Sequence, residues 1–310
     1  MRRLIFLILA LLAVVYCSGC AGTVDKQNDA AKKQSYVVQD VRGKKLSFES
    51  KPQKIISLYV YGDEVLLGLV DHKRIAGLSK WVHDEDLAMG AKEAKDVTKI
   101  AESNPEAILA LKPDLVLLPD SSKPEQISSL EDVGIKVFVY PAASRMSNIP
   151  KTIKAIGGAV GEPEQAEKLI AEMQKKISAV EAKVKKMQPE DRKKGLLFLR
   201  FGAIGGKGII FNDIMTAAGV EDCYEAARHA LADKPGTSRI LSKEEVVQAN
   251  PDYIIIGTWS QGGAYKAGNA QLDELYADPA LSTVTAVKKK QAIVIPQGYV
   301  NCLSQHAADS

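Results

Sequence analysis

Short apolar runs alternate with amphipathic segments along most of the chain. The apolar runs predict strands at residues 54–58, 74–78, 114–118, 135–140, 195–201, 252–256 and 291–295. The amphipathic segments predict helices at residues 63–69, 105–111, 124–133, 149–157, 212–218, 242–249 and 278–286. Strands that are largely apolar, separated by helices of about ten residues, indicate parallel sheets covered on both faces. A small hairpin is expected before them, over residues 36–48.

One amphipathic segment, residues 162–187, is much longer than the others. Pro163 falls in its first turn, where a missing N–H is tolerated. At 1.5 Å per residue it would span roughly 39 Å, which is longer than one small lobe needs. Its apolar positions recur at steps of three and four and form one stripe: Ala166, Leu169, Ile170, Met173, Ile177, Val180, Val184 and Met187.

An internal similarity indicates two lobes built to one plan. Residues 104–116 run from a helix through Pro-Asp into a strand, and residues 241–254 do the same. We therefore predict an α/β protein with two Rossmann-like lobes, each with a central parallel sheet, joined by one long helix. We predict an N-terminal lobe over residues 36–160, an inter-lobe helix over 161–188 and a C-terminal lobe over 189–310.

The N-terminus has the pattern of a secretory signal over residues 1–19. Arg2 and Arg3 precede an apolar run at 4–15, which is shorter than the roughly 20 residues of a permanent membrane span. Small residues before Cys20 resemble a bacterial lipobox, so Cys20 is the expected lipid attachment site and residues 20–35 a flexible polar tether. An ordinary signal without lipid is the alternative. Either way, we expect a location outside the cytoplasm, in a periplasm or at a Gram-positive cell surface.

The net charge bears on nucleic-acid binding, and the cysteines bear on a disulfide. A net charge of +3 gives no case for nucleic-acid binding, which needs a dense basic face. Cys223 and Cys302 remain beyond the leader, in a compartment where a disulfide could persist. A bridge and two inert thiols are both compatible with the sequence.

From Tyr36 onward the chain resembles the periplasmic binding proteins whose lobes are joined by a rigid helix and that serve siderophore, haem and cobalamin importers. The resemblance is carried by residues 51–58, 104–116, 134–137, the long helix and 272–294. It implies a monomer that is not an enzyme and has no cofactor of its own. It also implies capture of an iron chelate, haem or a corrinoid between the lobes, followed by delivery to an ABC permease and ATPase complex.

The resemblance also assigns two docking residues. Members of the family meet permease arginines through one acidic residue on each lobe, and the matching positions are Glu106 and Glu244. Glu245 stands beside the second position. The alternative is that each glutamate only complements the dipole at the start of a helix.

Ligand-binding residues should come from the loops that follow strands, because open parallel sheets bind ligands at the carboxyl ends of their strands. Exposed rings there offer flat apolar surface to a macrocycle, and arginines offer charge to an anion. The alternative is that such rings pack on the lobe beneath them. The candidates are Tyr59, Tyr61, Trp81, Arg145, Arg200, Trp259 and Tyr299.

Three further expectations depend on particular residues. Tyr59 and Tyr61 could hold ferric iron if the cargo is haem. Trp81 and Tyr299 fit aromatic positions of the cobalamin-binding branch, whereas Ile100 and Pro119 depart from it. The resemblance further implies that residues 302–310 begin a helix packed on the C-terminal lobe.

Three other functions remain as alternatives, and one of them is a surface adhesin or receptor that uses the fold without an importer. A binding protein for a free transition metal needs clustered ligands, but the histidines are scattered at His72, His83, His229 and His306. An extracytoplasmic enzyme on the same fold would need catalytic groups. The sequence has neither a Gly-x-Ser-x-Gly motif nor a glycine-rich phosphate loop ending in Lys-Ser or Lys-Thr.

Overall fold

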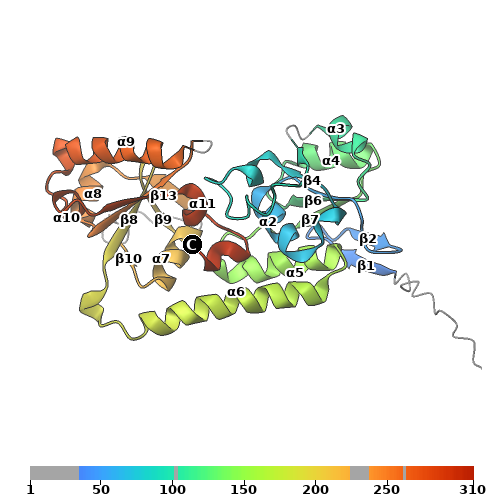
Figure 1. Ribbon diagram of the computed structural model, residues 1–310, viewed down its shortest axis with the longest axis horizontal. Helices are drawn as coiled ribbons and strands as arrows, with labels where there is room; N and C mark the ends of the chain where they lie inside the picture. The colour runs from blue at the N-terminus through green and yellow to red at the C-terminus, as the bar shows by residue number, and fades with distance from the viewer. Residues whose placement is uncertain (1–34, 101–103, 224–236, 261–262) are drawn as a thin grey trace, which may run out of the picture. The chain divides into compact units, whose positions relative to one another are not determined.

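The structure is a computed structural model that describes residues 35–100, 104–223, 237–260 and 263–310 (Figure 1). The expected signal, the tether up to residue 34 and Cys20 lie outside the described residues. Residues 35–310 form one unit by their contacts. Within this unit we call residues 35–162 the N-terminal half, residues 189–301 the C-terminal half and residues 302–310 the return segment.

The N-terminal half is built on a five-stranded parallel sheet with the order β5-β4-β3-β6-β7. An antiparallel hairpin precedes it. The strands are β1 (Tyr36–Gln39), β2 (Lys45–Phe48), β3 (Ile55–Ser57), β4 (Ile75–Ser79), β5 (Lys99–Ile100), β6 (Leu115–Pro119) and β7 (Val137–Tyr140). The helices are α2 (Val60–Leu69), α3 (Pro105–Ala110), α4 (Pro124–Asp132) and α5 (Ile149–Ala159), with short 3₁₀ turns η1 (His72–Arg74), η2 (Lys80–His83) and η3 (Met146–Asn148).

Burial on both faces explains why the strands of this sheet are apolar throughout. Successive side chains of a strand point to opposite faces. Leu115 and Leu117 of β6 accordingly enter a core shared with α2 and α5, whereas Val116 and Leu118 enter a second core with α3 and α4. All four side chains are fully buried. A single polar residue at any of these positions would therefore be buried without a partner.

The C-terminal half contains a six-stranded sheet with the order β11-β9-β8-β12-β13 and β10 beside β8. Strands β8, β10, β12 and β13 are parallel, whereas β9 pairs antiparallel with both β8 and β11. The strands are β8 (Lys194–Leu199), β9 (Gly202–Lys207), β10 (Glu221–Asp222), β11 (Thr237–Ile240), β12 (Tyr253–Thr258) and β13 (Ala292–Pro296). The helices are α7 (Ile210–Ala217), α8 (Lys243–Ala249), α9 (Ala264–Ala277), α10 (Thr285–Lys288) and α11 (Gln297–Val300), with η4 (Pro189–Asp191), η5 (Pro279–Leu281) and η6 (Gln305–Ala308).

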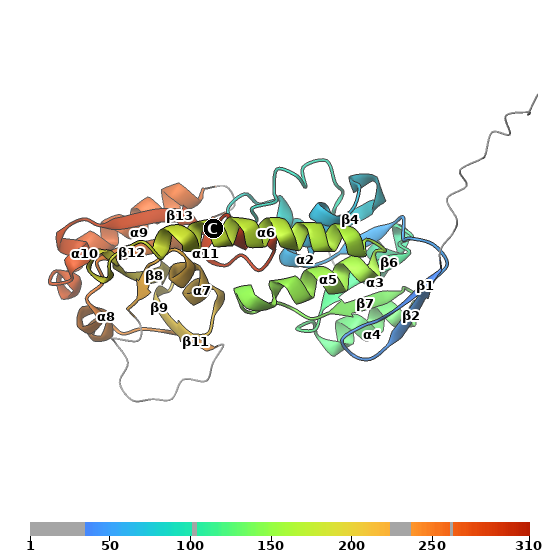
Figure 2. The same ribbon diagram turned by 90° about the horizontal axis from the view of Figure 1, so that it is seen from below.

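The predicted long helix is present as α6 (Pro163–Val184). It packs on α5 and α2 of the N-terminal half and reaches α7 of the C-terminal half (Figure 2). Ala166, Ile170 and Met173 of its apolar stripe are buried, whereas Val180 is 39% exposed. The beginning of α6 is thus embedded in the N-terminal core, and its end is held more lightly.

The fold class predicted from the sequence is confirmed, with two differences in detail. Strands β9 and β11 make the second sheet mixed rather than purely parallel. Helix α9 was not predicted, and the helix expected at residues 278–286 is instead the turn η5 followed by the short α10.

The expectation that residues 302–310 pack on the C-terminal lobe is wrong. The return segment lies against α6 and is hydrogen-bonded to α2 of the N-terminal half. Its buried residues Cys302 and Ala307 belong to the N-terminal core. The chain therefore passes from one half to the other at a second place besides α6.

Candidate functional site

The two tryptophans of the chain meet each other across the two halves. Trp81 lies in η2, directly after β4, and Trp259 follows β12. Their ring centroids are 5.8 Å apart and the rings are inclined at 72°, an edge-to-face contact. Trp81 is 40% exposed, so one side of this aromatic contact faces solvent. The carboxyl ends of strands from both sheets thus contribute to one aromatic surface.

The loop that carries Trp81 also bonds directly to the C-terminal half. Asp84 Oδ2 accepts a hydrogen bond from Trp259 Nε1 at 2.7 Å. Asp86 is buried, and its Oδ2 accepts from the backbone N–H of Ala264, in the first turn of α9, at 3.1 Å. The Asp86 carbonyl accepts from the N–H of Gly298 at 2.9 Å. The backbone N–H of Ser260 also donates to Asp86 Oδ2, at 3.4 Å, so several hydrogen bonds hold the loop to the opposite half.

Two cavities border the tryptophan contact, and together we call them the cleft. The larger, of about 750 Å³, includes in its lining Lys80, Trp81, Asp84, Asp86, Lys99 and Tyr265. The smaller, of about 520 Å³, includes Arg200, Thr258, Trp259, Gln271 and Glu274. Volumes of this size are typical of small-molecule sites.

Charges of both signs line the cleft. Lys80 Nζ lies 4.7 Å from the centre of the Trp81 ring, a cation–π contact. Asp84 and Asp86 stand in the same loop, and Lys99 lies in the adjoining strand. His83 adds no positive charge near neutral pH, because burial and then the charge of Lys99 lower the pKa of its imidazole. The surface therefore offers hydrogen-bond donors and acceptors without one dominant charge.

Arg200 and Tyr299 lie in the C-terminal half, each just after a strand. Arg200 is exposed, lines the smaller cavity, and its guanidinium carbon lies 4.8 Å from the centre of the Phe201 ring. Tyr299 lies in α11 after β13 and is 41% exposed. Arg200 and Trp259 thus line the same cavity.

The hydroxyls of Tyr59 and Tyr61 are already hydrogen-bonded within the protein. Tyr59 donates to Gln126 Oε1 at 3.3 Å. Tyr61 accepts from Asn301 Nδ2 at 2.8 Å, and burial raises the pKa of its phenol well above the usual value. Binding to ferric iron through a Tyr59 phenolate would therefore require the bond to Gln126 to break, and a Tyr61 phenolate would place a charge where burial disfavours it.

Arg145 lies apart from the tryptophans, in a groove lined by η3, α6 and α7. Its Nε donates to Asp213 Oδ2 at 2.7 Å, and its Nη2 also contacts that carboxylate. The backbone N–H of Met146 donates to the same oxygen at 2.8 Å. Because Asp213 belongs to α7, this ion pair joins the two halves on the side of α6.

The two predicted docking glutamates occupy equivalent places. Glu106 and Glu244 are exposed, and each lies in the first turn of its helix, α3 or α8. Glu245 has an internal role instead: it forms a capping box with Ser242 and an ion pair with Arg239. The Arg239 guanidinium and these hydrogen bonds lower the pKa of the Glu245 carboxyl to about 2. Of the two neighbouring glutamates, only Glu244 therefore has a carboxylate that is not used in an ion pair with Arg239.

Cys223 and Cys302 are free thiols buried in different cores, so the structure has no disulfide between them. Burial raises the pKa of the Cys223 thiol to about 12 and that of Cys302 higher still above its usual range. Among the described residues, no cluster of three or more His, Cys, Asp or Glu side chains is arranged to hold a metal ion. No helix within the described ranges combines the length and apolar character of a membrane span.

Sequence reasoning missed two buried carboxylates of α2, Asp63 and Glu64. Asp63 Oδ2 accepts from the N–H of Ser79 at 3.1 Å and from its hydroxyl at 2.5 Å. Glu64 Oε1 accepts from the N–H of Gly90 at 3.1 Å. Their signal in the sequence was weak, because an acidic residue near the start of a helix is usually exposed.

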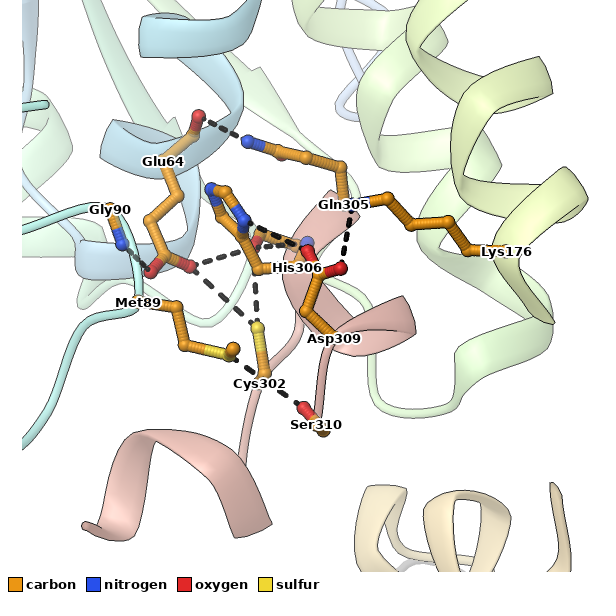
Figure 3. A network of polar contacts seen from close by, with 10 residues as sticks. Glu64, Met89, Gly90, Lys176, Cys302, Gln305, His306, Asp309 and Ser310 are labelled. Atoms are coloured by element: carbon orange, nitrogen blue, oxygen red, sulfur yellow. Dashed lines mark hydrogen bonds and ion pairs between the residues drawn. The ribbon is translucent and has the colours of Figure 1, made fainter. Parts of the chain in front are cut away.

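Figure 3 shows how Glu64 also bonds to the return segment. Its Oε2 accepts from the Ser304 hydroxyl at 2.7 Å, and its backbone carbonyl accepts from Gln305 Nε2 at 2.8 Å. Further along, Lys176 of α6 forms an ion pair with Asp309 at 2.6 Å. The return segment is therefore tied to both α2 and α6.

Comparison with known proteins gives a consistent picture. The family model described as periplasmic binding protein matches residues 55–299. A Bacillus subtilis protein described as an uncharacterized ABC transporter substrate-binding lipoprotein, YvrC, is 27% identical over 79% of this chain and 77% of its own length. A vitamin B12-binding protein of Pectobacterium atrosepticum is 26% identical over 71% of this chain and 75% of its own length. These relatives are described as binding proteins.

The fold is likewise found among solved structures. A possible iron-binding (periplasmic solute-binding) protein from Staphylococcus epidermidis superposes with a TM-score of 0.67 at 21% identity. The match covers 84% of this chain and 96% of that one. At this identity the likeness shows a shared fold.

Asp63 should make stability depend on pH in a defined window. Burial raises the pKa of its carboxyl from 3.8 to about 8, so the folded protein keeps a proton that the unfolded chain releases between these values. This group therefore opposes folding increasingly as pH rises from about 4 to about 8. We expect Asp63→Asn to gain free energy of unfolding relative to wild type over that window. Urea unfolding at several pH values measures the difference, and a difference independent of pH would contradict this assignment.

Proposed function

The chain belongs to the periplasmic binding protein family, and from this premise we propose that it captures an iron complex or a corrinoid in its cleft and delivers it to an ABC importer. A member of this family acts outside the cytoplasm with an ABC permease. The observation that carries the proposal is the contact of Trp81 and Trp259 from opposite halves. Bulky ligands with flat faces or apolar edges bind well to such rings.

The mixed charges of the cleft favour a cargo with little net charge. Three basic residues line the cleft together with four acidic ones: Lys80, Lys99 and Arg200, and Asp84, Glu85, Asp86 and Glu274. A corrinoid or an uncharged ferric hydroxamate carries many amide donors and acceptors, which suit such a surface. A ferric catecholate is multiply anionic and would meet the carboxylates as well as the bases. We therefore rank corrinoids and hydroxamates first, with haem next.

The tyrosines support the same ranking. Tyr59 and Tyr61 have internal hydrogen-bond partners, and the Tyr61 phenol is held neutral. Corrinoids and hydroxamate siderophores bring their own ligands for the metal, so they need no phenolate from the protein. Haem would need an axial group from elsewhere.

Delivery is proposed to use Glu106 and Glu244. Both are exposed in first helical turns of similar lobes, and the lowered pKa of Glu244, due to hydrogen bonds with backbone and with Ser242, keeps that carboxylate ionised. Arginines of a permease would bind these carboxylates through directional, charge-assisted bonds. Attachment to the membrane is proposed to be through lipid on Cys20, by the lipobox-like sequence before it.

Capture can be tested by calorimetry with cyanocobalamin, a neutral ferric hydroxamate, haemin and a ferric catecholate. We expect Trp81→Ala and Trp259→Ala each to weaken the best-bound cargo at least about tenfold, since losing an aromatic anchor costs on the order of 2 kcal/mol. Tyr36→Ala is the matched control, because Tyr36 stacks on Phe48 in the β1–β2 hairpin, outside the cleft. Unchanged affinity in both tryptophan variants would reject the cleft as the binding site.

Delivery can be tested by uptake in cells that depend on this protein. Replacing both Glu106 and Glu244 by Ala should abolish uptake and leave cargo affinity unchanged. The control replaces Glu125 and Glu164, which are also exposed acids in first helical turns, and should transport normally. Normal uptake by the first double variant would refute the docking assignment.

Lipid attachment can be tested by cell fractionation. Cys20→Ala should move the protein from the membrane fraction to the soluble or secreted fraction, because the acylated residue is lost. Cys17→Leu is the control: it removes the other cysteine of the leader, places the usual lipobox residue there, and should stay with the membrane. Membrane retention of the Cys20 variant would show that another feature anchors the chain.

A further inference from the structure

The loop from Ser79 to Gly90 forms one wall of the cleft, and each of its ends is bonded to a buried acidic side chain of α2. Asp63 binds the first end through the N–H and hydroxyl of Ser79. Glu64 binds the last end through the N–H of Gly90. Between these ends lie the cleft residues Lys80, Trp81, Asp84 and Asp86.

Both acidic side chains are almost completely removed from solvent. Asp63 is 0% exposed and Glu64 is 1% exposed. Burial of a carboxyl group costs free energy that hydrogen bonds to its oxygens offset, and here the bonds at Asp63 Oδ2 and at both Glu64 carboxyl oxygens serve this purpose. Consecutive residues on a helix point about 100° apart, since 3.6 residues make one turn. Adjacent positions on α2 can therefore reach opposite ends of one loop.

The position of Gly90 shows how closely the loop approaches Glu64. A Cβ atom at residue 90 would lie 3.2 Å from Glu64 Cγ, which is tighter than ordinary contact. The loop backbone can come this near because residue 90 has no side chain. The last end of the loop is therefore fixed by shape as well as by a hydrogen bond.

Glu64 also bonds to the segment that returns from the C-terminal half. Its Oε2 accepts from Ser304, and its carbonyl accepts from Gln305 (Figure 3). The same side chain thus touches the cleft loop on one side and the return segment on the other. A displacement of the cleft loop would therefore strain the bonds to the return segment, and a displacement of the return segment would strain the bond to the loop.

We infer that Asp63 and Glu64 are positioning residues for cargo capture: by holding both ends of the 79–90 loop, they set how Trp81, Asp84 and Asp86 meet the C-terminal half. Both side chains are buried, so the proposed role is to position the loop and not to contact the cargo. This role rests on the proposed function only in that the cleft is taken as the site that binds the cargo. That Asp63 and Glu64 hold the ends of the loop is a statement about its geometry and does not depend on the cargo.

Substitutions at Glu64 separate the acceptor from the charge. Ala removes the acceptor and leaves the Gly90 N–H and the Ser304 hydroxyl without it. Asp keeps the charge but is one methylene too short to reach both groups. Gln keeps the length and one acceptor oxygen, which can still accept from Gly90, while its amide can donate to Ser304.

Asp40 provides a matched control elsewhere in the N-terminal half. It is 5% exposed, and its Oδ1 accepts from the N–H groups of Arg42 at 2.9 Å and Lys44 at 3.0 Å. It therefore fastens the β1–β2 turn in the way that Glu64 fastens the cleft loop. Asp40→Ala should lower stability without altering the cleft.

The experiment reads tryptophan emission and cargo affinity for the full chain and its variants at a temperature where all are folded. Emission is specific for the cleft, because Trp81 and Trp259 are the only tryptophans in the chain. We expect Glu64→Ala and Glu64→Asp to shift the emission and weaken binding of cyanocobalamin or a ferric hydroxamate about tenfold, the equivalent of 1.4 kcal/mol. Glu64→Gln and Asp40→Ala should resemble wild type in both measurements.

Two results would overturn the inference: wild-type emission and affinity in Glu64→Asp, or an equal change in Asp40→Ala. If Glu64→Ala does not fold, Glu64→Asp decides. If wild type binds none of the probes, the proposed function fails, and the emission of the Glu64 and Asp40 variants still decides whether the loop is held in this way.

Discussion

The cleft depends on the hydrogen bonds that hold one loop in place, the loop between Ser79 and Gly90. These bonds run in two directions. The ends of the loop are bonded to buried acidic side chains of α2, and its middle is bonded through Asp84 and Asp86 to the C-terminal half. The position of Trp81 against Trp259 follows from these bonds. The contact between the two rings thus depends on the hydrogen bonds that hold the loop.

This arrangement suits a protein that must hold a bulky cargo without folding around it. Helix α6 joins the halves on one side, together with the Arg145–Asp213 ion pair. The return segment crosses between them at a second place. Two connections restrict relative motion more than one does, so a ligand meets a largely formed surface and less entropy is lost on binding. On the proposed function, selectivity would come from the rings and the mixed charges of the cleft.

The fold could be predicted from the sequence because its signals are local. Strands such as β6 are apolar on both faces, and the stripe from Ala166 to Met173 identifies α6 directly. Helix α9 was missed because its buried positions include Ala264 and Gly268, which carry little hydrophobic signal. Trp81 and Trp259 were predicted from their place after strands, whereas Asp63 and Glu64 could not be, since their partners lie in segments that only the tertiary structure brings near.

The most direct measurement is a crystal structure of the protein with its best-bound cargo. The account predicts that the cargo contacts both Trp81 and Trp259, with the loop from Ser79 to Gly90 still bonded to Asp63 and Glu64. Cargo bound away from both tryptophans, for example in the groove between α6 and α7 beside Arg145, would contradict it.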